Sequence, residues 1–342
     1  MNYILSVDWV QVRCSGVVCS SVPGYSVEFL PRESKYFRQV FQVVRDNEIL
    51  LTGQQSPKFD CGSSTLVLLK VQNRQLYEGN PRQILQEFCK AAHLQINALT
   101  RLDICADFVR FDSGILPKTF INSFIRGNIR VKGKYKFSVF GFTGDELDCQ
   151  TLTIGRLESP YYFRLYNKTK ELQEKKDKPY IRKMWEKLPN KYNDPVWRLE
   201  VKCTDEALTY FDEESGEYIN LANIDYTAPE VLQQVFSVFL RDKYRFYHYS
   251  GKCRADREDD CILFDTKPTK WHPYKDPSKS DTTKMDKYFL KMLYNLDKEM
   301  RTYKEDADDP IIKDICKRYA DEHGIVNTLA MLENQPTPPH FR

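Results

Sequence analysis

A tyrosine stands between two cations in the stretch YYFRLYNKTKE, residues 161–171. Arg164, Tyr166 and Lys168 are each two residues apart, and side chains two apart in a β-strand point to the same face. A phenol with such neighbours is a candidate nucleophile, because positive charge stabilises the phenolate and lowers the pKa of the tyrosine. A tyrosine in a strand is more commonly a packing residue. Both interpretations stay open from this stretch alone.

Two further stretches alternate in the same way. RLDICADF places Asp103 and Asp107 on the face opposite to its apolar residues, and WRLEVKC does the same with Arg198, Glu200 and Lys202. If the three strands share a sheet, their ionisable side chains gather on one face. Clustered carboxylates repel one another unless a cation joins them, and oxygen ligands suit Mg²⁺ or Mn²⁺. The alternative is a solvated sheet face with cross-strand ion pairs.

The remaining pattern predicts an α+β fold, with a mainly antiparallel central sheet and flanking helices. YFRQVFQVVRDNEILLTGQ indicates a hairpin that turns at Asp46-Asn47, and STLVLLKVQNRQLY indicates another pair of strands. NPRQILQEFCKAAHL predicts a helix with Asn80 as its N-cap and Pro81 in its first turn. Further helices are expected over LPKTFINSFIRG, TKELQEKKDKPYIRKMWEKL and APEVLQQVFSVFLRDKYRFYHY.

The composition changes near residue 265. We expect residues 1–265 to fold together, with a division into two subdomains near 112–145 as an alternative. DTKPTKWHPYKDPSKSDTT is rich in Pro, Lys and Asp, which predicts a linker or surface arm over 266–283. Amphipathic patterns then predict a helical C-terminal extension over 284–342.

Positive charge is concentrated in the middle of the chain, although the formal net charge is only +3. Residues 113–144 contain no acidic side chain, and aromatic residues alternate with the cations there. This pattern predicts a DNA track with phosphate contacts and base stacking, with an ordinary amphipathic hairpin as the alternative. The predicted DNA-contacting residues are Arg126, Arg130, Lys132, Lys134, Lys136, Arg156 and Arg198, and the aromatic ones are Tyr135, Phe137, Phe140 and Phe142.

Membrane association is not expected. No apolar run approaches the length of a bilayer span, and MNYILSVDWVQV alternates too regularly for a signal peptide. The sequence therefore predicts a cytoplasmic protein.

Taken together, RLDICADF, TIGRLESPYYFRLYNKTKE and WRLEVKC resemble, in order and spacing, the Rep_trans family of replication initiation factors. These are rolling-circle initiators of plasmids and phages, related to relaxases of conjugative transposons. The resemblance covers about residues 1–265. The chain departs from the family pattern at Arg156, after Gly155, and at Asn167, where an acidic residue is usual.

The resemblance implies roles for individual residues. Tyr166 would nick one DNA strand, and Arg164 and Lys168 would contact the scissile phosphate or support the phenolate. Asp103, Asp107 and Glu200 would bind the metal ion, with the choice between the two aspartates open. Arg198 would orient Glu200.

The resulting hypothesis is a metal-dependent, site-specific nicking and strand-transfer enzyme that acts through a 5′-phosphotyrosine. Its partners would be origin DNA, double-stranded or cruciform and nicked on one strand, a host helicase, and a second copy of the chain. A relaxase of a mobile element would use the same active site and is the first alternative. A non-catalytic DNA-binding protein is the alternative from another class.

Overall fold

The computed structural model describes residues 2–58, 65–133, 135–141, 148–175, 177–189, 194–251 and 258–274, and all that follows concerns these residues. The chain divides into two compact units, Met1–Tyr274 and Lys275–Arg342. Residues 112–145 belong to the first unit. The predicted helical extension over 284–342 lies outside the described residues, as does most of the predicted linker.

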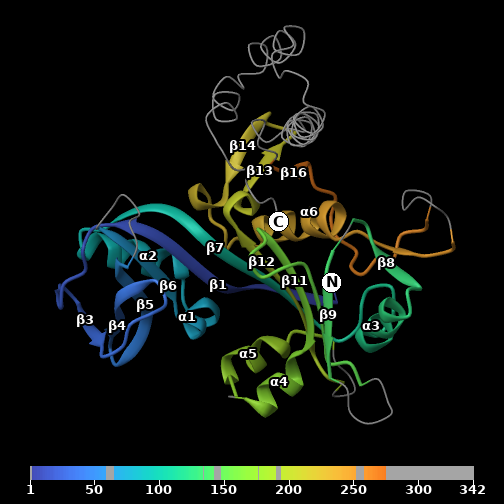
Figure 1. Cartoon of the computed structure of the whole chain (residues 1–342), viewed down its shortest axis with the longest axis horizontal. Coiled ribbons are helices and arrows are strands. Elements are labelled where there is room, and N and C mark those ends of the chain that lie inside the picture. Colours follow the sequence, from blue (N-terminus) through green and yellow to red (C-terminus); the bar gives the residue numbers. More distant parts are fainter. Residues whose placement is uncertain are drawn as a thin grey trace, which may run out of the picture. The chain divides into compact units, whose positions relative to one another are not determined.

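An eleven-stranded sheet, antiparallel at every pairing, forms the centre of the first unit (Figure 1). Its order is β2-β3-β4-β5-β6-β1-β7-β12-β11-β10-β9. With the helices around it, this confirms the predicted α+β class. The strands are β1 (Tyr3–Ser15), β2 (Ser21–Val22), β3 (Tyr25–Leu30), β4 (Phe37–Arg45), β5 (Glu48–Pro57), β6 (Leu66–Val71), β7 (Gln95–Phe108), β9 (Phe137–Phe140), β10 (Thr151–Ile154), β11 (Tyr161–Asn167) and β12 (Trp197–Thr204).

Two small sheets and six α-helices complete the described part. The order β14-β13-β16 joins Glu217–Asn220, Thr209–Asp212 and Trp271–Pro273, and β15 (Phe246–His248) pairs with β8 (Ile129–Val131). The helices are α1 (Asn73–Glu78), α2 (Pro81–Ala91), α3 (Pro117–Ile125), α4 (Lys168–Glu174), α5 (Pro179–Trp185) and α6 (Pro229–Val238). No helix of the described residues is long and apolar enough to cross a bilayer.

Local signals in the sequence correctly predict several of these elements. β4 and β5 form the expected hairpin, and Asp46 and Asn47 adopt φ values of 53° and 63°, as a tight two-residue turn requires. Asn80 caps α2, since its side chain accepts a hydrogen bond of 3.1 Å from the backbone N–H of Gln83. These features depend only on neighbouring residues.

Three expectations are wrong. The second half of STLVLLKVQNRQLY forms helix α1, in keeping with its Arg, Gln, Leu and Glu residues, rather than a strand. The basic segment 126–142 is no hairpin, because β8 pairs with β15 while β9 pairs with β10. Residues 271–273, placed in a linker by composition, form strand β16 against β13. The last two depend on partners distant in sequence.

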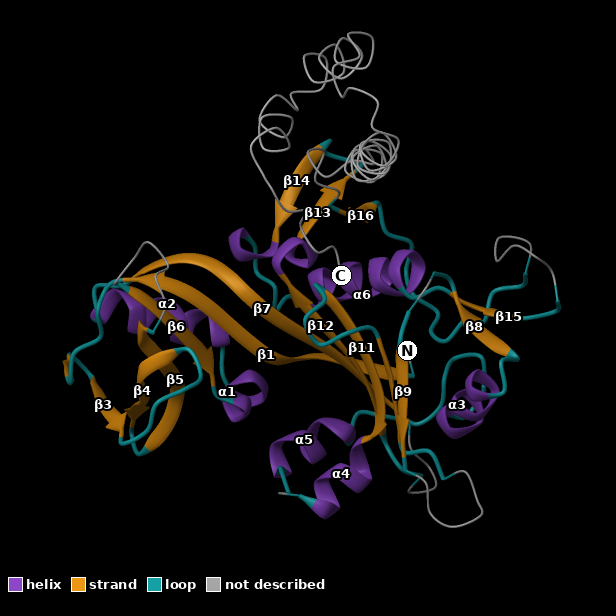
Figure 2. Cartoon of the chain, viewed as in Figure 1, coloured by secondary structure: helices purple, strands orange, loops and turns teal. Residues whose placement is uncertain are grey.

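Helices cover the two faces of the sheet differently (Figure 2). On one face α6 packs on β1 over an aromatic core, where the rings of Tyr3 and Phe236 are 5.7 Å apart. On the other face lie α1, α4 and α5, which contact the polar side chains of the sheet. The second face carries the candidate site.

Candidate active site

The three strands that carry the ionisable residues are neighbours in the sheet, as the sequence hypothesis assumed. β11 pairs with β12, and β12 pairs with β7. Arg198 of β12 lies opposite Tyr166 of β11 on one side and Asp107 of β7 on the other. Two residues further along β12, on the same face, Glu200 lies opposite Arg164. Antiparallel pairing therefore brings residues separated by more than 90 positions onto one face.

Arg198 is the centre of this face. Its guanidinium is completely buried and binds Asp107 with both fork nitrogens, Nε to Oδ1 at 2.6 Å and Nη2 to Oδ2 at 2.7 Å. Its third nitrogen, Nη1, donates to Asp8 Oδ1 at 2.8 Å. The expectation that Arg198 contacts DNA is therefore wrong for this structure, because its donors are used by two aspartates inside the protein.

Asp8 is a member of the site that the sequence analysis missed. A β-bulge between Val7 and Trp9 inserts one extra residue into β1, and Asp8 points to the polar face at this position. Tyr77 and Asn73 of α1 also donate to Asp8 Oδ1, at 2.6 and 3.1 Å. A lone acid in the apolar stretch ILSVDWV was the available signal.

The phenol of Tyr166 lies between a cation and a carboxylate. Its hydroxyl donates to Glu200 Oε2 and accepts from Lys168 Nζ, both at 3.2 Å. The guanidinium of Arg164 lies 4.1 Å from the ring centroid. The side-chain arrangement expected from the alternation is thus present.

The predicted direction of the Tyr166 pKa is wrong. Tyr166 is only 3% exposed, and burial together with the nearby Glu200 carboxylate raises its pKa well above the ordinary tyrosine value. The positive charge of Arg198 acts in the opposite direction but is outweighed. The flanking cations are visible in the sequence and predict a lowered pKa, but the burial that raises the pKa depends on the tertiary structure.

The end of the face at Tyr166 is covered by the helical pair α4–α5. Asn167 caps α4 through its side chain, which accepts from the backbone N–H of Lys170 at 3.0 Å, so this departure from the family pattern has a structural role. From α5, Trp185 Nε1 donates to Asp107 Oδ2 at 2.8 Å. Tyr180 donates to Asn73 Oδ1 at 2.9 Å. These contacts hold the cover against α1 and the sheet.

Glu200 has an unusual electrostatic environment. Burial raises its pKa to about 7, and the carboxylates of Asp8 and Asp103 add to this effect. Burial likewise raises the pKa of Asp103, although Arg101 is hydrogen-bonded to both of its carboxylate oxygens. Three carboxylates that oppose each other's ionisation form the kind of donor set that a divalent cation would stabilise.

The predicted metal ligands fit such a cation in part. Within the described ranges, no three His, Cys, Asp or Glu side chains are close enough to form a ready metal site. Both oxygens of Asp107 are hydrogen-bonded, to Arg198 and Trp185, so Asp107 is better placed to hold Arg198 than to bind metal. Glu200 Oε1 and Asp8 Oδ2 accept no hydrogen bond from the described residues, which leaves these carboxylates the better donors.

The basic segment 126–142 includes β9, which is an edge strand of the central sheet. Four of its predicted DNA contacts, Arg126, Arg130, Lys132 and Lys136, are exposed, as is Arg156 further along the chain. Lys134 and Phe142 lie outside the described residues. Phe140 of β9 is 60% exposed and stands in the same cross-strand row as Thr151 and Tyr166. Phe137 points to the other face, where its ring packs on Phe124 at 5.2 Å.

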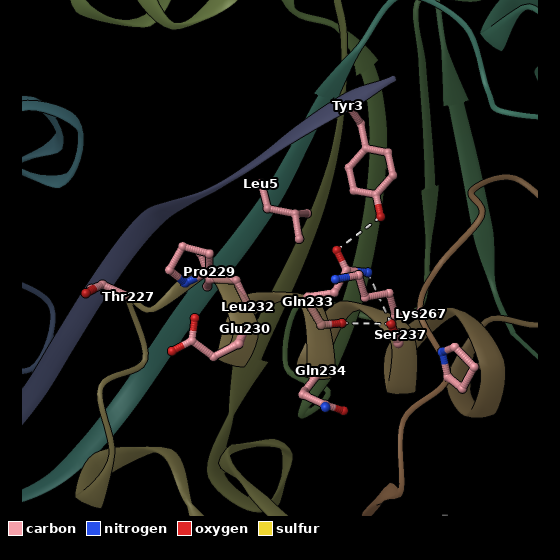
Figure 3. Close-up of a pocket in the computed structure, with 11 residues that line it drawn as sticks. Tyr3, Leu5, Thr227, Pro229, Glu230, Leu232, Gln233, Gln234, Ser237 and Lys267 are labelled. Carbon is pink, nitrogen blue, oxygen red and sulfur yellow. Dashed lines mark hydrogen bonds between the residues drawn. The ribbon is translucent and has the colours of Figure 1, made fainter. Parts of the chain in front are cut away.

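A separate pocket of about 610 Å³ opens between β1 and α6 (Figure 3). Tyr3 and Gln233 line it and are joined by a hydrogen bond of 3.2 Å, with Ser237 beside them. None of the predicted site residues lines this pocket. The chemistry suggested by the sequence therefore belongs to the opposite face.

Comparisons with known proteins find similarity to a solved structure but to no family model. No protein-family model matches the chain, and no curated protein matches it. Membership of the Rep_trans family therefore stays a prediction. A solved structure, the rolling circle replication initiator protein from Geobacillus stearothermophilus, is 14% identical, covers 76% of this chain and 93% of its own, and has a TM-score of 0.46.

We expect Arg198→Lys to destabilise the fold by about 2 kcal/mol or more. Lysine keeps the positive charge, but its single ammonium cannot make a bidentate bond to Asp107 and also donate to Asp8. Buried carboxylate oxygens then lose hydrogen bonds. Urea unfolding of the full chain measures the effect. Arg13→Lys, at an exposed position of β1, is the matched control. Equal free energies of unfolding for the two variants would contradict the central role of Arg198.

The acid sensitivity of the fold should depend on Asp8. Burial by itself would raise the pKa of Asp8, but Arg198, Lys168 and two hydrogen bonds hold it well below the ordinary value. The stabilisation is therefore complete above the unfolded-state pKa of about 3.9 and is lost as the pH falls below it. Between pH 5 and pH 3, Asp8→Asn should lose less of its unfolding free energy than the wild type, with exposed Glu28→Gln as the control.

Proposed function

We propose that this protein is a DNA nicking and joining enzyme in which Tyr166 forms a covalent link to the 5′-phosphate of the cut strand. The observation that carries the proposal is the Tyr166 hydroxyl, hydrogen-bonded between Lys168 and Glu200 and flanked by Arg164. A phenol, a proton acceptor and two cations are what phosphoryl transfer to a tyrosine needs. The three sequence motifs that resemble the Rep_trans family supply the same residues.

The proposed step is an in-line displacement at phosphorus. The phenol oxygen of Tyr166 forms a bond to the phosphorus while the bond from phosphorus to the 3′-oxygen breaks. The phenol proton passes to Glu200 Oε2, its hydrogen-bond acceptor, and the departing 3′-oxygen takes up a proton to become a hydroxyl. With a pKa of about 7, Glu200 can accept a proton near neutral pH. The reverse step rejoins the strand without a nucleotide cofactor.

The two cations have distinct tasks in this proposal. Lys168 donates to the phenol oxygen and would stabilise the phenolate as the proton leaves. Arg164 has no carboxylate ion pair among the described residues, so its guanidinium is available to the phosphate oxygens. Arg198, which is buried, would act at a distance by fixing β12 and thereby the position of Glu200.

A bound Mg²⁺ or Mn²⁺ would polarise the scissile phosphate. The carboxylates best suited to hold it are Glu200 and Asp8, whose mutual repulsion the cation would relieve. Both oxygens of Asp103 are already hydrogen-bonded to Arg101. Asp107 would serve as the partner of Arg198 and Trp185.

Access of DNA to Tyr166 requires a movement of the α4–α5 cover, because the phenol is almost completely buried. The exposed ring of Phe140, two strands from Tyr166 on the same face, is suited to stack on a base of the incoming strand. The exposed cations of residues 126–136 and Arg156 would bind phosphates of the origin. Initiation of rolling-circle replication is the role we propose, with a relaxase as the alternative that has the same chemistry.

Replacing Tyr166 by Phe should abolish the covalent adduct. The test incubates the protein with Mn²⁺ and a supercoiled plasmid that carries its own origin, and then separates protein-linked DNA on a denaturing gel. Tyr162→Phe is the matched control, since Tyr162 also lies in β11 but has no contact with Glu200 or Lys168. Adduct formation by Tyr166→Phe at the wild-type level would reject the nucleophile.

Removal of divalent cations by EDTA should abolish nicking, and Mn²⁺ should restore it. If Glu200 is a ligand, Glu200→Gln should raise the half-saturating Mn²⁺ concentration by about tenfold or more. Binding is measured independently as the rise in melting temperature with Mn²⁺. An unchanged half-saturating concentration with a slower reaction would contradict the ligand role and leave Glu200 as the proton acceptor alone.

The burial of Tyr166 favours one other function, that of a non-catalytic DNA-binding protein. In that case the carboxylates and cations are a structural network, and the surface cations alone bind backbone. This alternative predicts DNA binding that falls steeply with salt but is unaffected by EDTA and by Tyr166→Phe. The adduct assay therefore separates the two functions.

A further inference from the structure

Lys70 is a partly buried cation of the polar face that contacts an aromatic ring and no carboxylate of the described residues. Its ammonium lies 3.2 Å from the centroid of the Trp9 ring, and it makes no ion pair or hydrogen bond with the described residues. Arg198, Arg101 and Lys168 each have a carboxylate partner. A half-buried cation without such a partner loses hydration and receives little in return.

The surroundings of Lys70 add positive charge. Arg101 also lies over the Trp9 ring, at 4.0 Å, and both cations are opposite Gln11 in the register of β6, β1 and β7. Burial, together with the charges of Arg101 and Lys178, lowers the pKa of Lys70 to about 8, although Asp103 and Asp8 act in the opposite direction. The fold thus holds two cations against one indole, although this arrangement is electrostatically unfavourable without an anion.

This cluster continues the face that carries Tyr166. In β7, Arg101 is four residues from Cys105, so these two residues lie about 13 Å apart along the strand. Cys105 is opposite Glu200 of β12. Trp9, Lys70 and Arg101 are all partly exposed, unlike Tyr166 and Lys168. DNA could reach these three side chains without the movement of the α4–α5 cover that binding at Tyr166 requires.

We propose that Lys70, Arg101 and Trp9 form a second nucleotide subsite, which binds a backbone phosphate and its base on single-stranded DNA next to the cleavage position. The proposal rests on the proposed function, since it takes the strand at Tyr166 as its starting point.

The chemistry of the three side chains fits this ligand. The phosphate would supply the anion that Lys70 lacks, and the ammonium would turn from the indole ring to the phosphate oxygens. The ring face released in this way is available to a base, and stacking on an aromatic ring is how single strands are bound without regard to sequence. Arg101, already fixed by Asp103, would keep its position and add a second charge.

The test compares the affinity of full-length variants for single-stranded oligodeoxythymidine of about 16 nucleotides over a series of salt concentrations. Lys70→Gln should weaken binding several-fold at low salt and reduce the slope of log Kd against log salt by about 0.7, the value for one phosphate contact on a single strand. Lys90→Gln, an exposed lysine of α2, removes the same charge away from the site and is the control.

A second pair of variants tests the ring. Trp9→Leu should weaken binding about fivefold or more, while Trp9→Phe, which keeps a stacking surface, should retain most of the affinity. Melting temperatures measured alongside separate a loss of binding from a loss of fold. Lys70→Gln should melt no lower than the wild type, because the variant removes a cation without leaving a carboxylate unpaired.

The two proposals fail separately. If Lys70→Gln has the same affinity and salt slope as Lys90→Gln, the subsite is rejected, even when the wild type forms the covalent adduct. If the wild type forms no adduct, but the Lys70→Gln variant shows a salt slope lower by one phosphate contact, nicking is rejected and the subsite stands.

Discussion

The ion pair between Arg198 and Asp107 is the interaction on which the rest of the polar face depends. A fully buried guanidinium is tolerated only when its donors are satisfied, and here two aspartates from β7 and β1 satisfy them. A register slip of one residue would turn Arg198 into the apolar core and expose Leu199. The pair therefore fixes the alignment of β12 with β7, and with it the opposition of Glu200 to Cys105.

Around this pair the polar face has two unlike ends. The end at Tyr166 is closed, because α4 and α5 cover it and Tyr166, Lys168 and Arg198 are buried there. The end at Lys70 is partly open, and Lys70 has no ion pair among the described residues, whereas Arg101 is paired with Asp103. A dry site strengthens electrostatic interactions with a bound substrate, whereas an open cationic surface captures a polyanion. The contrast suits a strand that binds first at one end and reacts at the other.

The sequence predicted which side chains lie together on one face better than it predicted their protonation. The period-two alternation of Arg164, Tyr166 and Lys168 identified side chains that do lie on one face and do touch. It gave the wrong direction for the Tyr166 pKa, since the cover formed by residues 168–185 removes the phenol from water. Charge can be counted along a strand, but desolvation depends on what packs over it.

Local patterns in the sequence determined the α+β class, the hairpin at Asp46-Asn47, the cap at Asn80 and the polar faces of β7, β11 and β12, because each depends on residues close together in the chain. Only the tertiary structure decided that β8 pairs with β15 rather than with β9, and that a bulge brings Asp8 to Arg198. It also decided that both oxygens of Asp107 accept hydrogen bonds from Arg198. These outcomes depend on contacts between residues as far apart as Asp8 and Arg198. No local propensity encodes such contacts, since they form only when the whole sheet is assembled.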